Sequence, residues 1–183
     1  MRLFLILLCI TLGMPILACA QWKRDGAPVQ DESWRKSNGD FGAMLVLLDS
    51  PAEFAEEWSS TPSEHVPTVK PLSKLIRGST FGAVVLFTGC KPKGGLCDAT
   101  VDFKILKPDG TTYGDDPGLD LWIGFPPPPK FNQQLSHANL GIRIEDKDPI
   151  GVYQIIATVH DRVAHRDIEL SSSFEVTDAM AAK

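Results

Sequence analysis

Residues 148–161 read DPIGVYQIIATVHD, and the fold prediction starts from this stretch. Alternate side chains in it are apolar, which is typical of a β-strand with one face against a core. A second alternating run covers residues 168–176, after a short polar segment. The two runs predict a long antiparallel hairpin. Its inward face would consist of Tyr153, Ile155, Ala157, Val159, Ile168, Leu170, Phe174 and Val176.

Runs further upstream predict more strands, at the intervals typical of a β-sandwich. Residues 75–78, 101–105 and 140–144 are predicted strands, and KPDG at 107–110 is a predicted turn. Residues 41–48 and 81–88 are predicted strands of another kind, because they are apolar at both parities. We therefore expect these two to be covered on both faces.

Two of these features resemble the macroglobulin-type and fibronectin-type modules of bacterial exported proteins. One is the Pro-x-Gly-x-Tyr sequence at residues 149–153, which leads into a long strand, and the other is the KPDG turn. The resemblance covers residues 72–176. It implies a mainly β, immunoglobulin-like antiparallel sandwich, and it brings no catalytic or ligand residues with it.

A short accessory helix is predicted near residues 51–59. Ser50 is a favoured helix cap, and Pro51 suits the first helical position. Phe54 and Trp58 are four residues apart, so they share one face and can dock on the core.

The first 20 residues have the pattern of a signal peptide. Arg2 is followed by the apolar stretch 3–12, and Ala-Cys-Ala at 18–20 supplies small residues at the cleavage positions. Two alternatives stay open, which are lipidation of Cys19 and an uncleaved anchor. Cleavage would leave a polar leader at 21–40, and the predicted organisation continues with one sandwich domain at 41–176 and a flexible tail at 177–183.

Cleavage would also leave two cysteines, Cys90 and Cys97. An even count in an exported chain predicts one disulfide, and the predicted location is the periplasm or the extracellular medium. Their six-residue spacing fits neither a typical redox motif nor a structural zinc site.

The net charge of −5 argues against two classes of partner. Nucleic-acid binding needs a basic surface to neutralise phosphates, and anionic membranes attract basic segments. No basic run here exceeds two residues. We therefore expect a protein or cell-envelope component as the partner, with no membrane span after cleavage.

Residues 115–136 are predicted to be a long connection that contains four consecutive prolines. Long loops in compact domains are often functional. Trp122, Phe125 and Phe131 in this segment are candidates for a partner-binding anchor, since aromatic side chains dominate binding hot spots. The alternative is that the three rings fold back and cap an open edge of the sandwich.

The predicted hairpin also places two histidines near its tip. If Val159 faces Ile168, then His160 pairs with Asp167 and His165 lies diagonally beside them. Two histidines and one aspartate are a reasonable ligand set for Zn²⁺ or Cu²⁺. The alternative is a solvated tip at which His160 simply pairs with Asp167.

The common enzyme motifs are missing: there is no G-x-S-x-G, P-loop, H-E-x-x-H or dinucleotide fingerprint. The sequence therefore favours a non-enzymatic exported binding or structural module. A periplasmic metal-binding protein and an unrecognised hydrolase are the alternatives.

Overall fold

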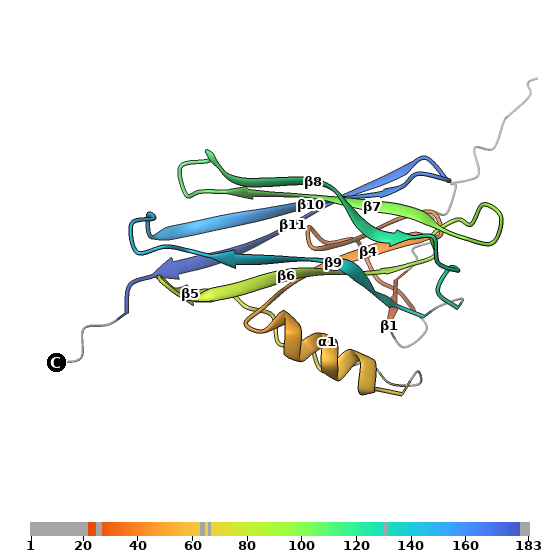
Figure 1. Cartoon of the computed structure of the whole chain (residues 1–183), viewed down its shortest axis with the longest axis horizontal. Helices are drawn as coiled ribbons and strands as arrows, with labels where there is room; N and C mark the ends of the chain where they lie inside the picture. The colour runs from red at the N-terminus through yellow and green to blue at the C-terminus, as the bar shows by residue number, and fades with distance from the viewer. Residues whose placement is uncertain (1–21, 25–26, 63–64, 66, 130–131, 180–183) are drawn as a thin grey trace, which may run out of the picture.

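The computed structural model describes residues 22–179, except for 25–26, 63–64, 66 and 130–131. The predicted signal peptide, Cys19 and Phe131 lie outside the described residues. In the part of the chain that is described, the long strands form two packed sheets, with one helix on the outside (Figure 1).

The larger sheet has the strand order β5-β11-β10-β7-β8, and the smaller sheet has the order β3-β4-β6-β9. A minor two-stranded pair, β1 and β2, precedes them. The bounds are β1 Lys23–Arg24, β2 Ala27–Pro28, β3 Arg35–Asn38, β4 Phe41–Leu48, α1 Pro51–Ser60, β5 Lys74–Ile76, β6 Thr80–Thr88, β7 Asp98–Leu106, β8 Thr112–Ile123, β9 Gln134–Arg143, β10 Gly151–Asp161 and β11 Arg166–Thr177.

The fold is therefore mainly β and an immunoglobulin-like sandwich, as predicted. All pairings within the two sheets are antiparallel except one, because the short edge strand β5 runs parallel to β11. Within the described residues, no helix is both long and apolar enough to cross a membrane.

The β10–β11 hairpin has the predicted register, with Val159 opposite Ile168. Its inward side chains are buried between the two sheets. Tyr153 begins this face, and its hydroxyl donates a 2.8 Å hydrogen bond to the carbonyl oxygen of Pro149. This bond resembles the tyrosine corner of immunoglobulin-like domains, in which a tyrosine bonds the backbone a few residues upstream.

Strands β4 and β6 are apolar at both parities because both faces of each are covered. One face contributes to the core between the sheets, while Val46, Leu48 and Val84 on the other face pack against Phe54 of helix α1. The helix begins as predicted, since the Ser50 hydroxyl accepts a hydrogen bond from a backbone N–H in the first turn.

The leader and the tail are more structured than the sequence suggested. Residues 35–38 of the predicted leader form strand β3 and pair with β4. Trp22 is buried, and its indole nitrogen donates to the carbonyl oxygen of Lys36. At the other end, Thr177 completes β11 and Asp178 forms an ion pair with Arg77. The polar composition of residues 21–40 gave no indication of strand β3 or of the burial of Trp22.

The prediction of a long connection at 115–136 was wrong. Residues 112–123 form strand β8, and β9 starts at Gln134. Gly114, Pro117 and Gly118 interrupt the usual strand pattern, and such residues are tolerated because β8 is a sheet edge. Three register shifts against β7 accommodate them.

Candidate functional site

One end of the sandwich brings together residues from three separate parts of the chain. We call it the loop end and define it as residues 90–98, 122–126 and 161–166. The backbone N–H of Cys97 donates to the carbonyl oxygen of Phe125 over 2.8 Å, which joins the first two segments. The N–H of Arg162 donates to the carbonyl oxygen of Asp98 over 3.0 Å, which joins the first and third.

The first segment is closed by the predicted disulfide between Cys90 and Cys97, whose Cα atoms are 6.0 Å apart. Both cysteines are buried in the core. Between them, Lys93 pairs with Leu96 across Gly94 and Gly95, which both have positive φ. Two such residues form the tight hairpin turn that favours glycine at both central positions. The disulfide therefore fixes the base of this loop, and the glycine turn determines the conformation of its tip.

The second segment displays apolar side chains. Gly124, with φ +78°, and Phe125 together oppose Cys97, as in a glycine-containing β-bulge. Phe125 is 45% exposed, Leu96 of the first segment is 45% exposed, and Ile123 is 37% exposed. These three are half of the exposed large apolar side chains among the described residues, and the other three are Ile76, Ile150 and Val152.

The Trp122 ring contacts the Phe125 ring, with centroids 5.1 Å apart, but Trp122 is less exposed. Its ring is half-buried and packs against Phe87 of the core, with centroids 5.7 Å apart, and against His137 of β9, at 4.4 Å. Its indole nitrogen donates to the carbonyl oxygen of Pro126 over 2.8 Å. Trp122 therefore closes the side of the sandwich between β8 and β9. Of the two predicted anchor residues that the structure describes, Phe125 is the more exposed.

Asp161 organises the third segment, and the sequence analysis missed it. It is 1% exposed, and its carboxylate accepts hydrogen bonds from the backbone N–H groups of Val163 and Ala164, and also from that of Lys91 at 2.8 Å. An aspartate that bonds the N–H two residues later is a recognised turn signal. The contact with the distant Lys91 has no local signal.

His160 lies next to the loop end on the exposed face of the larger sheet. Its Nδ1 is 2.7 Å from Asp167 Oδ1, as the predicted register implies, and its Nε2 is 3.2 Å from Asp102 Oδ2. Partial burial lowers the pKa of His160, but the hydrogen bonds to the two carboxylates outweigh this effect and raise the pKa above its ordinary value. The arrangement favours a protonated imidazole held by two anions.

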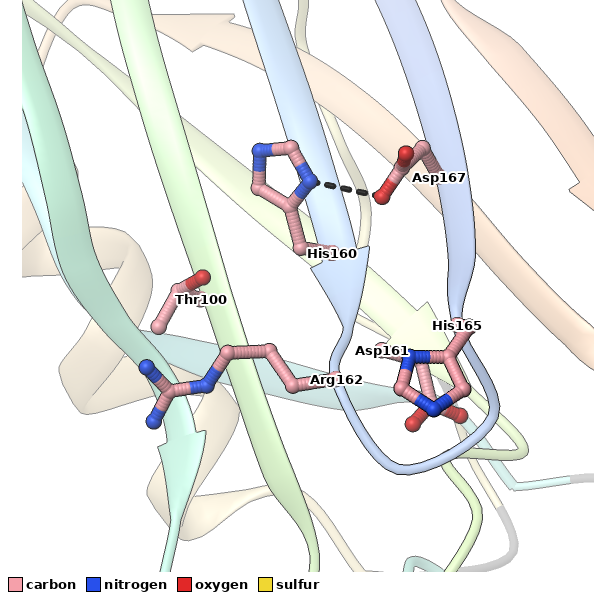
Figure 2. A pocket seen from close by; sticks show the side chains of 6 residues that line it. All are labelled: Thr100, His160, Asp161, Arg162, His165 and Asp167. Carbon is pink, nitrogen blue, oxygen red and sulfur yellow. Dashed lines mark hydrogen bonds and ion pairs between the residues drawn. The ribbon is translucent and has the colours of Figure 1, made fainter.

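His165 does not join this group. Figure 2 shows its ring beside the hairpin loop, apart from the His160–Asp167 pair. The two histidines, Asp167 and Arg162 line an open depression of about 440 Å³, together with Thr100 and Asp161. Within the described ranges, no three histidine, cysteine, aspartate or glutamate side chains are arranged to hold a metal ion. Both ring nitrogens of His160 are already hydrogen bonded to carboxylates.

Comparisons with known proteins do not assign this chain to a family. No protein-family model matches this chain, and a search of curated proteins finds no match. Solved structures with a related shape include a family 123 glycoside hydrolase from Clostridium perfringens, with 10% identity, a TM-score of 0.42 and 75% of this chain covered. Another is an alkylpurine DNA glycosylase from Pseudomonas fluorescens bound to DNA, with 16% identity, a TM-score of 0.36 and 57% of this chain covered.

A third is a Niemann-Pick type C2 protein from the Japanese carpenter ant, with 12% identity, a TM-score of 0.37 and 73% of this chain matched to 89% of that protein. The chain spans 27% of the length of the hydrolase and 27% of that of the glycosylase. At these identities and scores, the likenesses support no inference about activity.

Proposed function

We propose that this chain is an exported, non-enzymatic binding module that contacts a partner protein through its loop end. The observation that carries the proposal is the exposure of Leu96, Ile123 and Phe125 on a backbone that hydrogen bonds and a disulfide hold in place. Exposed apolar side chains that gather in one region are a mark of interaction surfaces. A loop that is already ordered also loses less conformational entropy when a partner binds.

Export is supported by the signal-like residues 1–20 and by the Cys90–Cys97 disulfide, since disulfides persist in oxidising compartments. Mass spectrometry of the protein recovered from the producing cell tests this part. We expect a mature chain that begins at Gln21. If Cys19 carries a lipid instead, the protein is exported but anchored to a membrane, and cleavage after Ala20 does not occur. An intact N-terminus together with free thiols would contradict export.

The binding surface is tested by selecting short random displayed peptides on the folded protein. We expect the selected peptides to bind wild type and to lose binding to the Leu96→Ser/Phe125→Ser variant. A matched control is Ile150→Ser/Val152→Ser, which removes two exposed apolar side chains from the opposite end of the hairpin. Equal binding to wild type and to the loop-end variant would place the binding surface elsewhere.

A further inference from the structure

The charges of the loop end differ in sign from those of the whole chain. The net charge of the chain is −5, whereas the segment 91–96 reads KPKGGL and carries two lysines and no acid. Because the two glycines give the tip no side chains, Lys91 and Lys93 are the charged groups that this segment presents.

Two acidic groups near these lysines are already engaged. Asp98 forms an ion pair with Arg162, and Asp161 is buried and bonded to backbone N–H groups. Neither Lys91 nor Lys93 has an ion-pair partner among the residues that the structure describes.

These two lysines also lie beside the exposed apolar side chains. Lys93 exchanges backbone hydrogen bonds with Leu96, and Leu96 precedes Cys97, which bonds Phe125. The backbone of Lys91 is held by Asp161. The two lysines are therefore carried on a backbone that is already fixed, and Lys93 is paired directly with the exposed Leu96.

We propose that the loop end recognises an acidic polypeptide segment, in which carboxylates flank an apolar side chain. The apolar side chain contacts Leu96 and Phe125, and the carboxylates approach Lys91 and Lys93. Complementary charge at the margin of an interface steers association and excludes basic partners. This inference rests on the proposed function and adds the chemistry of the partner to it.

The test uses the peptides selected on wild type, synthesised and measured individually by fluorescence anisotropy. We expect them to be rich in aspartate and glutamate next to an apolar residue. The Lys91→Glu/Lys93→Glu variant should bind them about tenfold more weakly, because each exposed ion pair contributes up to about 1 kcal/mol. Affinity should also fall as salt is raised. The control Lys70→Glu/Lys147→Glu makes the same charge change at exposed sites elsewhere and should bind normally.

The other outcomes separate the two proposals. One outcome would overturn the acidic partner and leave the loop end as a binding surface. In that outcome the selected peptides need Leu96 and Phe125, are neutral or basic, and bind the Lys91→Glu/Lys93→Glu variant normally. Peptides indifferent to both variants would overturn both proposals. Binding of phosphatidylglycerol vesicles, with no loop-end peptide recovered, would assign the surface to a membrane and also overturn both.

Discussion

The carboxylate of Asp161 lies 2.8 Å from the backbone nitrogen of Lys91, which is 70 residues earlier in the chain. This hydrogen bond connects the hairpin β10–β11 to the disulfide-closed loop. The same carboxylate also accepts two N–H groups of its own turn. One buried side chain thus positions two of the three segments that form the loop end.

Replacing Asp161 by asparagine should destabilise the protein. The amide keeps the size but loses the charge and turns one acceptor into a donor, so we expect the free energy of unfolding to fall by about 2 kcal/mol. Urea denaturation measures it. Asp167→Asn, at a largely exposed carboxylate, is the control and should cost less than about 1 kcal/mol. Equal costs for the two variants would mean that Asp161 does not hold the loops.

Removing the disulfide should also lower stability. A closed loop of about eight residues constrains the unfolded chain by about 2.5 kcal/mol, and Cys90→Ala/Cys97→Ala removes that constraint. The variant should therefore unfold at a lower urea concentration than the oxidised wild type. An unchanged midpoint would show that the bond has no stabilising role.

The two aromatic residues of the loop end should behave differently. Trp122→Ala removes a ring that contacts the core, so we expect a loss of about 3 kcal/mol. Phe125→Ala removes a ring that is nearly half exposed, and we expect a loss of about 1 kcal/mol or less. Thermal and urea denaturation compare them. A larger loss for Phe125→Ala would make that ring part of the core and remove it from the binding surface.

The pair of carboxylates at His160 should make stability depend on pH. The pKa of His160 is raised in the folded protein above its ordinary value near 6.5. The folded state therefore binds the proton more tightly than the unfolded state, and this contribution to stability is complete below about pH 6.5. It is lost as the pH rises through the folded pKa.

His160→Gln should abolish this part of the pH dependence, and NMR titration of the imidazole in wild type should give the raised pKa directly. The variant Asp102→Asn removes one of the two carboxylates and should bring the pKa down. A wild-type pKa at or below about 6.5 would contradict the arrangement.

The sequence predicted what depends on local pattern. The alternation within 148–161 and 168–176 predicted both the hairpin and its register, so the pairing of His160 with Asp167 followed from it. The helix cap at Ser50 and the disulfide are local in the same sense. The apolar runs at 41–48 and 81–88 indicated strands covered on both faces, which the helix and the core confirm.

The rest depends on contacts between distant parts of the chain. Asp102 reaches His160 because β7 pairs with β10, and no sequence spacing indicates that neighbour. The hydrogen bond between Cys97 and Phe125 depends on strand β8. The glycines and the proline of this strand are typical of a loop, so the sequence did not predict it. The three segments of the loop end were therefore recognised separately, and their common location came from the structure.

The central claim is that these three segments act as one binding surface. Its most direct test is an NMR titration of ¹⁵N-labelled wild type with a peptide selected on the folded protein. We predict that the amide shifts that change most lie within residues 91–97, 123–125 and 161–166. Changes centred on β5 and the start of β10, at the other end of the sandwich, would contradict the claim.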